Sequence, residues 1–207
     1  MSRLTNELIH KGYLQTDILI DAFSELGRVE FVPKEFEKDA DADIPLPIGF
    51  GQTISQPTVV AFMMELLDPK RDQKILDVGS GSGWTTAILS YVAGSHGKVI
   101  ALDQQEKIKE FGESNTDKFG FVKKGIASFF TGDGSKGFPS EAPFDRILVS
   151  AGAEHVPEDL KSQLAIGGKM VIPISTRNSI MYLEKKGEDD FYTEEYPGFS
   201  FVPLIIG

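Results

Sequence analysis

Apolar residues near the start of the chain first follow helical spacing and then give way to turn-forming residues. Residues 16–26 carry apolar side chains three and four positions apart, and Gly27 provides a stop signal, which together predict a helix. Residues 28–51 are rich in Pro, Gly and Asp, which predicts an extended segment or loop. The apolar run at residues 57–67 predicts a second helix.

After residue 74 the pattern changes, and short apolar runs alternate with helical stretches. Strands are predicted at residues 74–78, 98–102, 144–150, 169–174, 180–185 and 199–206. Helices are predicted at residues 85–93, 106–119 and 157–164. This alternation indicates a mainly parallel sheet that is covered on both faces. Because no helix separates the last two strands, we expect them to form an antiparallel pair at one edge.

The whole pattern predicts an α/β fold of the Rossmann-like kind, in which a helical N-terminal extension precedes a mainly parallel, seven-stranded sheet. A length of 207 residues and a hydrophobic content of 41% are sufficient for one buried core. We therefore expect a single domain over residues 1–207. Residues 1–70 would supply the N-terminal helices and the loop, and residues 71–207 the ligand-binding core.

Composition excludes several kinds of chemistry. The chain has no cysteine, which excludes disulfides, thiolate metal sites and cysteine nucleophiles. Its three histidines are scattered and the acidic run at residues 188–190 reads as solvated, so we expect no metal site. A net charge of −10 with dispersed Lys and Arg disfavours a nucleic-acid partner. Without a signal-peptide pattern or a long apolar run, the sequence predicts a cytoplasmic protein that is not attached to a membrane.

The strongest local motif is the glycine-rich stretch at residues 77–84, Asp-Val-Gly-Ser-Gly-Ser-Gly-Trp. It follows a predicted strand and opens a predicted helix, which is the setting in which such a turn binds a nucleotide. Glycines permit the tight turn and let a ligand approach the backbone. Asp103 ends the next strand, where its carboxylate can accept hydrogen bonds from both hydroxyls of a ribose. A further strand, the third in chain order, is expected just before the Gly-Asp-Gly turn at residues 132–134. Asp133 in this turn is placed to read an adenine amino group.

A nicotinamide dinucleotide site shares these features but needs a different spacing. Its fingerprint, Gly-x-Gly-x-x-Gly or Ala, would place a small residue where this chain has Trp84. Asp77 at the strand end instead favours a methyltransferase-type site, in which it can organise the turn or meet the amino-acid end of the cofactor. The sequence contains no Gly-Lys-Ser or Gly-Lys-Thr loop, which argues against nucleotide hydrolysis.

The stretch at residues 45–57, Pro-Leu-Pro-Ile-Gly-Phe-Gly-Gln-Thr-Ile-Ser-Gln-Pro, resembles the pre-core motif of protein-L-isoaspartate O-methyltransferases. Similarity to this family extends over residues 28–207 and includes the segments 28–33, 76–84, 132–134, 142–147, 167–173 and 201–204. The resemblance implies a class I methyltransferase fold. It also implies S-adenosylmethionine as cofactor and S-adenosylhomocysteine as product.

Five positions depart from the family pattern. Trp84 stands where Tyr is more common, and Asp103 where Glu is more common. Gln104 begins a segment that more often contains Arg, Thr58 takes a place often held by His or Tyr, and Gly152 interrupts an alanine run. Thr58 and Gln104 lie nearest the implied pocket, so cofactor affinity and acceptor choice are the properties that these departures would change.

The resemblance further implies methyl esterification of the free carboxylate of L-isoaspartyl residues in damaged proteins or peptides, which amounts to protein repair. Such a carboxylate has a pKa of about 3.3–4, so it is already ionised at neutral pH and needs no general base. Ser55 is the catalytic residue implied by the motif, because its hydroxyl can bind the acceptor carboxylate and aim one oxygen at the methyl group. A helix N-cap ahead of Pro57 is the alternative role of Ser55, and the two roles are compatible.

The predicted cofactor contacts lie in the pre-core motif or at strand ends: Gln52, Thr53, Asp77, Gly79, Ser80, Gly81, Gly83, Asp103, Gln104, Gly132 and Asp133. The expected partners are isoaspartyl-containing proteins and peptides, with no nucleic acid and no membrane, and the protein is expected to be a monomer. Two alternatives stay open. One is a methyltransferase of the same fold that acts on peptide aspartate, a small molecule or RNA, and the other is a non-catalytic module that binds S-adenosylmethionine.

Overall fold

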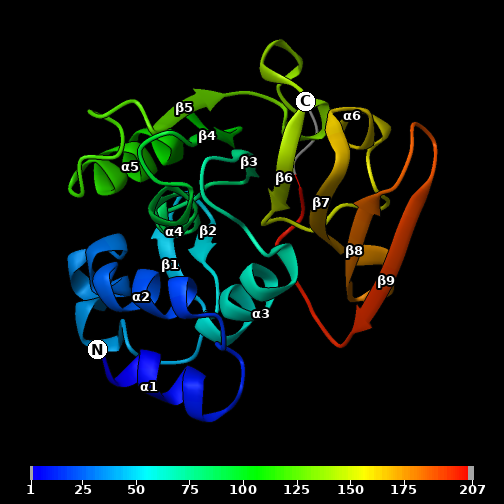
Figure 1. The fold of residues 1–207 in the computed structure, drawn as a ribbon. Coiled ribbons are helices and arrows are strands. Elements are labelled where there is room, and N and C mark those ends of the chain that lie inside the picture. The colour runs from blue at the N-terminus through cyan, green and yellow to red at the C-terminus, as the bar shows by residue number, and fades with distance from the viewer. Residues whose placement is uncertain (1, 205–207) are drawn as a thin grey trace.

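The structure, a computed structural model, describes residues 2–204 and is built around one seven-stranded sheet (Figure 1). Its strand order is β5-β4-β3-β6-β7-β8-β9. The strands are β3 (Lys74–Val78), β4 (Lys98–Asp103), β5 (Ala127–Thr131), β6 (Phe144–Val149), β7 (Leu164–Ile174), β8 (Ser179–Lys185) and β9 (Phe191–Pro197). Strands β3 to β7 run parallel, whereas β8 and β9 are antiparallel at one edge. The predicted fold class is therefore confirmed.

Helices and a small hairpin surround this sheet. The α-helices are α1 (Arg3–His10), α2 (Asp17–Glu25), α3 (Pro57–Leu67), α4 (Trp84–Ala93), α5 (Glu106–Asp117) and α6 (Glu158–Ser162). The short 3-10 helices are η1 (Arg28–Phe31), η2 (Lys34–Asp39), η3 (Gly134–Lys136), η4 (Pro139–Glu141) and η5 (Ser175–Arg177). Strands β1 (Leu46–Gly49) and β2 (Gln52–Ile54) form the hairpin. Among residues 2–204, no helix is long and apolar enough to cross a membrane.

Alternate residues of the parallel strands pack into different hydrophobic clusters, as the two faces of a pleated sheet require. Ile75, Val99 and Leu148 belong to the larger cluster, which also contains buried side chains of α1 to α5. Leu76 and Ile147 point the other way, into a cluster that includes α6. Figure 1 shows the N-terminal helices α1 and α2 at the lower left and α6 at the upper right, beside the end of β7. Both faces are therefore covered, as expected.

Parallel strands bring their carboxyl ends to one edge of the sheet, which is where ligands bind in folds of this kind. The turns that follow β3, β4 and β6 meet at this edge. The hairpin β1–β2 and the start of α3 lie beside them, so the pre-core motif and the glycine-rich turn are brought together in space (Figure 1).

Several predicted elements differ from the structure. Helix α1 was not predicted, and residues 28–51 contain η1, η2 and β1 in addition to loop. Helix α6 is shorter than predicted, because Leu164 already belongs to β7. The antiparallel partner of β8 is β9, not residues 199–206. Strand β9 is mostly exposed and polar, so it lacks the hydrophobic signal of a strand. In the predicted strand, Pro203 forms only an isolated bridge with Gly152, and residues 205–206 lie outside the described part of the chain.

Candidate active site

The glycine-rich turn lies between β3 and α4, at the carboxyl edge of the sheet. The backbone N–H groups of Gly79 and Ser80 donate to the carbonyl oxygen of Leu102 at 2.8 and 3.0 Å, which ties the turn to β4. Gly83 is the N-cap of α4 and has a φ of +83°. A Cβ at this position would lie 2.3 Å from the carbonyl oxygen of Gly112 on α5. Position 83 therefore requires glycine for its backbone conformation and for the space it leaves.

Helix α5 supports the turn through polar side chains that are buried. Asn115 donates from Nδ2 to the carbonyl oxygen of Ser82 at 3.0 Å, and the Thr116 hydroxyl donates to the next carbonyl oxygen at 3.1 Å. A Cβ on Gly112 would lie 2.6 Å from the carbonyl oxygen of Gly81. This support was not predicted from the sequence. The available signal was the spacing of Gly112, Asn115 and Thr116, which places them on one face of a helix.

Asp77 is fully buried beneath the turn. Its Oδ2 accepts hydrogen bonds from the hydroxyls of Thr85 at 2.9 Å and Thr86 at 2.6 Å, whereas Oδ1 has no partner among the described residues. Burial raises the pKa of Asp77 to about 6, opposed by the two hydroxyl hydrogen bonds and assisted by the Asp103 carboxylate. A buried carboxylate that is only half satisfied favours a ligand that brings a positive charge or a hydrogen-bond donor.

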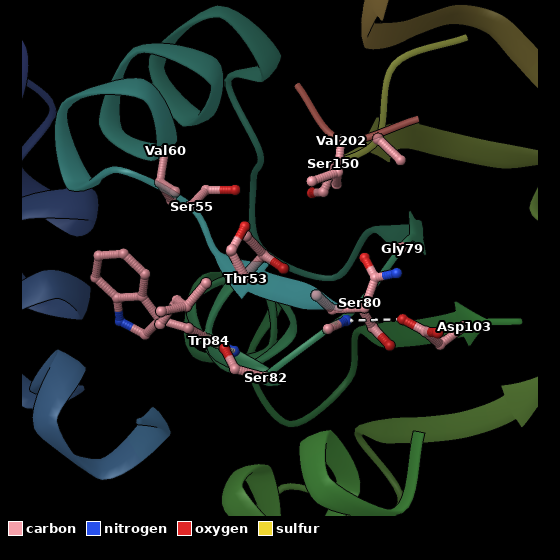
Figure 2. Close-up of a pocket in the computed structure, with 15 residues that line it drawn as sticks. Thr53, Ser55, Val60, Gly79, Ser80, Ser82, Trp84, Asp103, Ser150 and Val202 are labelled. Atoms are coloured by element: carbon pink, nitrogen blue, oxygen red, sulfur yellow. Dashed lines mark hydrogen bonds between the residues drawn. The ribbon is translucent and has the colours of Figure 1, made fainter. Parts of the chain in front are cut away.

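Asp103 ends β4 and faces the glycine-rich turn (Figure 2). Its Oδ2 accepts a hydrogen bond from the backbone N–H of Gly81 at 3.1 Å, and its Oδ1 accepts one from the N–H of Gln105 at 3.1 Å. Burial raises the pKa of Asp103, although the backbone hydrogen bonds oppose this effect. Because a carboxylate offers about four acceptor positions, Asp103 retains capacity for two more donors, such as a pair of ribose hydroxyls.

Two adjoining clefts open at this edge of the sheet. The first, with an empty volume of about 500 Å³, shares Gln52, Gly79, Asp103 and Ala151 with the second. Three buried acceptor atoms have no hydrogen-bond partner in residues 2–204: Ser80 Oγ and Gln104 Oε1, whose residues line the clefts, and Asp77 Oδ1, beneath the glycine-rich turn. Buried polar atoms are nearly always satisfied in folded proteins, so these acceptors can bind the donors of a polar ligand or of water.

Ser55 lies at the junction of β2 and α3, on the wall of the first cleft opposite Ser150 (Figure 2). The N-cap of α3 is Gln56, and no side chain of the cap residue bonds to the helix. The first free amide of α3, the N–H of Thr58, donates to Asp43 Oδ1 at 2.9 Å, and the Thr58 hydroxyl donates to Oδ2 at 2.5 Å. The N-cap role considered for Ser55 is therefore wrong. The Ser55 hydroxyl is available to a ligand in the first cleft.

Arg28 supports the Ser55 wall from inside the protein, where only 2% of the residue is exposed. Burial lowers the pKa of Arg28 to about 10, against the attraction of nearby aspartates. Its guanidinium also lies 5.7 Å from the centre of the Trp84 ring. Five backbone carbonyl oxygens accept its hydrogen bonds, at distances between 2.8 and 3.4 Å, and they belong to Ala40, Ala42, Ile44, Ile54 and Ser55.

A sequence profile of the protein-L-isoaspartate(D-aspartate) O-methyltransferase family matches residues 1–207. The chain belongs to this family. A protein-L-isoaspartate O-methyltransferase of Methanopyrus kandleri is 42% identical over 205 residues, which cover 98% of this chain and 90% of the relative. The corresponding protein of Flavobacterium psychrophilum is also 42% identical over 205 residues, which cover 99% of this chain and 93% of the relative.

Solved structures give the same fold. A solved structure of a protein-L-isoaspartate O-methyltransferase superposes with a TM-score of 0.87 at 30% identity, over 97% of this chain and 64% of that longer chain. A Plasmodium falciparum protein described as a protein-L-isoaspartate O-methyltransferase also superposes with a TM-score of 0.87, at 24% identity, over 98% of this chain and 96% of that chain. That protein was solved in complex with S-adenosyl-L-homocysteine.

Most cofactor contacts predicted for this methyltransferase line the two clefts. Those that do are Gln52, Thr53, Gly79, Ser80, Gly81, Asp103, Gln104 and Gly132. Asp77 lies beneath the turn, and Gly83 packs against α5. Asp133 accepts hydrogen bonds from the backbone N–H and hydroxyl of Ser135 through Oδ1, and its neighbour Gly134 lines the second cleft. The cofactor contacts themselves stay predictions, but the structure brings eight of the eleven residues into one continuous space.

The C-terminal segment contributes to the methyltransferase site, which was not predicted. Gly152 donates its N–H to the carbonyl oxygen of Val202 and accepts from the N–H of Leu204, both at 2.8 Å. Val202 lines the first cleft and Leu204 the second. A Cβ at Gly152 would lie 3.3 Å from the Cβ of Ser175, which is a tight contact.

Trp84, the other large departure from the family pattern, is a core residue that also lines the first cleft. Its indole Nε1 donates to the carbonyl oxygen of Leu26 at 3.0 Å, and its ring meets Phe23 edge-on. Trp84 therefore connects the cofactor turn to α2. Among residues 2–204, no group of three His, Asp or Glu side chains is placed to hold a metal ion.

Proposed function

We propose that this protein transfers a methyl group from S-adenosylmethionine to the free carboxylate of L-isoaspartyl residues in damaged proteins and peptides. The full-length match to the family carries this function. The site supports it, because the hydroxyl of Ser55 lies in the same cleft as the acceptor groups expected of a nucleoside site. The product would be a methyl ester, together with S-adenosylhomocysteine.

The residues of the two clefts fit this cofactor. Asp103 has spare acceptor positions for the ribose hydroxyls. The unpartnered Asp77 Oδ1 and Ser80 Oγ suit the positively charged amino-acid end, and Gln104 Oε1 suits an amino group of the adenine. The raised pKa of Asp77, about 6, belongs to the protein without this positive charge, and binding would lower that pKa because an opposite charge favours the ionised carboxylate.

S-adenosylmethionine, when bound, supplies a methyl group carried on a sulfonium cation. The acceptor carboxylate is ionised at neutral pH and is itself the nucleophile, so the protein needs no general base. The task of the chain is therefore to hold the carboxylate in line and to exclude water. Well-oriented reactants gain roughly 7–11 kcal/mol over free ones. The Ser55 hydroxyl orients one carboxylate oxygen, and Arg28 fixes the Ser55 backbone through its carbonyl oxygen at 3.0 Å.

The proposed partners are isoaspartyl-containing proteins and peptides. The net charge of −10 disfavours a phosphate backbone as partner. We further propose that the protein acts in the cytoplasm as a monomer that is not attached to a membrane. Light scattering coupled to size-exclusion chromatography would test the monomer directly.

The experiment that tests the function is methyl transfer from labelled S-adenosylmethionine to two synthetic peptides that differ only in one isoaspartyl or aspartyl linkage. We expect a base-labile label on the isoaspartyl peptide alone. Label on the aspartyl peptide instead would indicate a biosynthetic carboxyl methyltransferase. Cofactor binding without label on either peptide would show that the isoaspartyl carboxylate is not the acceptor.

A further inference from the structure

Three hydroxyl-bearing residues lie where two cavities meet. Thr53, Ser55 and Ser150 line the first cleft and also a third cavity, which opens outward between Pro45 and the C-terminal segment. In Figure 2 Ser55 lies to one side and Ser150 to the other, and Thr53 lies below and between them. An acceptor side chain that enters from the third cavity must pass these residues to reach the cofactor cleft.

The Ser150 hydroxyl is available for a ligand. Its side chain makes no hydrogen bond to any other residue from 2 to 204, and the same is true of the Ser55 side chain. The Ser150 backbone is fixed, because its N–H donates to the carbonyl oxygen of Val78 at 2.8 Å. A rigid backbone that carries a free hydroxyl into a cleft is a preorganised donor.

Other donors for an anion are scarce at this junction. The linings of the first cleft and the third cavity contain no Lys, Arg or His. The first free amide of α3 is already bound by Asp43, so the helix N-terminus offers less to an anion than it otherwise would. Apart from the side-chain amides of Gln52 and Gln56, and the Trp84 indole that is bound to Leu26, the side-chain donors on these linings are hydroxyls, and a carboxylate has two oxygens to satisfy.

We propose that Ser150 is a second substrate contact, which donates its hydroxyl hydrogen to one oxygen of the acceptor carboxylate while Ser55 binds from the opposite wall. This rests on the proposed function. Ser150 keeps its proton throughout: one carboxylate oxygen bonds to the methyl carbon as the methyl–sulfur bond breaks and its electron pair stays on sulfur. Ser150 thereby restricts rotation of the carboxylate and helps select an isoaspartyl side chain over a longer or shorter acid.

The test compares Ser150→Ala and Ser150→Thr with the wild type in initial-rate kinetics on an isoaspartyl peptide. Removal of one hydrogen bond to a charged group should lower kcat/KM by about tenfold to a hundredfold. Ser150→Thr keeps the hydroxyl and should recover most of the loss. Quenching of Trp84, the single tryptophan in the chain, reports cofactor affinity, which should stay at the wild-type value in both variants.

Ser95→Ala is the matched control, because Ser95 is exposed and precedes β4 at the opposite end of the sheet. A kcat/KM of Ser150→Ala equal to that of Ser95→Ala would overturn the proposal, and so would a parallel loss of cofactor affinity. In a double variant with Ser55→Ala, a combined loss smaller than the product of the two single losses would support contact with the same carboxylate. A wild-type protein that binds cofactor but does not label the isoaspartyl peptide would instead refute the proposed function.

Discussion

The two sides of the active-site cleft are built in different ways. The cofactor side, residues 77–105, is one β-α-β unit whose turn is held by hydrogen bonds to the neighbouring strand. The acceptor side joins residues that lie far apart in the sequence, namely Arg28, Asp43, Ser55, Ser150 and Val202. Glycines shape the first side, with support from side chains of α5, whereas hydrogen bonds of Arg28 and Asp43 hold the second.

This difference shows two ways in which the geometry of one site is fixed. The turn on the cofactor side depends on backbone conformations that only glycine adopts easily, so its shape is encoded locally, and α5 then supports it. The Ser55 wall combines the end of β2 with irregular backbone, and a single buried arginine binds five of its carbonyl oxygens. Changes on the two sides should therefore have effects of different size and kind.

The largest effect is expected for Arg28→Met. Loss of the guanidinium leaves buried carbonyl oxygens on the acceptor side without donors, so the free energy of unfolding should fall by about 4 kcal/mol. Arg177→Met removes only an exposed ion pair with Glu195 at 3.2 Å and should cost less than about 1 kcal/mol. Urea unfolding measures both. Equal stability of the two variants would show that Arg28 does not hold the acceptor side.

Gly83→Ala should have the next largest effect, because the added methyl group clashes with the backbone on the cofactor side. The new Cβ would meet the Gly112 carbonyl oxygen at 2.3 Å, and neither backbone can move away easily. We expect a loss of about 3 kcal/mol in the free energy of unfolding. Gly125→Ala is the control, because Gly125 has a φ of +72° but nothing within 4 Å of an added Cβ. It should lose only about 1–2 kcal/mol.

At neutral pH, Asp77→Asn should raise the free energy of unfolding but weaken cofactor binding. The folded state raises the pKa of Asp77 from 3.8 to about 6, so the folded protein binds more protons than the unfolded chain between these values. The contribution of Asp77 to the free energy of unfolding therefore falls as the pH rises from about 4 to about 6. The variant should be more stable than the wild type at about pH 7 and lose that advantage at about pH 4. An equal difference at both values in urea unfolding would contradict the account.

The same variant should bind cofactor more weakly, because the ionised carboxylate attracts the positive charge. In the wild type, cofactor affinity should fall as pH drops through about 6, where Asp77 becomes protonated. Asp77→Asn should show a flatter pH dependence over this range. Trp84 fluorescence titrations at several pH values measure both curves. Parallel curves would mean that Asp77 does not meet the charged end of the cofactor.

The smallest effect is expected for Asn115→Ala. This change removes one buried hydrogen bond to the Ser82 carbonyl oxygen, at 3.0 Å, and should cost about 1–2 kcal/mol. Asn6→Ala removes a hydrogen bond of similar length, 3.1 Å, but an exposed one, and should change the stability little. Urea unfolding of the two variants gives the comparison. A similar small loss for both would mean that α5 does not support the turn.

The same contrast explains how much could be predicted from the sequence. Asp77, the glycines and Asp103 were found because a strand, a turn and a helix leave a local pattern. The support from Asn115 and the capping of α3 by Asp43 were missed, because these contacts join residues far apart in the sequence. Helical spacing places Asn115 on one face of α5, but it does not indicate which turn that face meets. Strand β9 was missed for a related reason, since an exposed edge strand needs no hydrophobic alternation.

The measurement that tests the separation of the two sides most directly is a paired determination of cofactor Kd and peptide kcat/KM for Ser55→Ala. If the acceptor wall is distinct from the cofactor turn, kcat/KM should fall by about a hundredfold while the Kd is unchanged. A rise in cofactor Kd that accounts for the whole loss of activity would contradict this account, because Ser55 would then belong to the cofactor side.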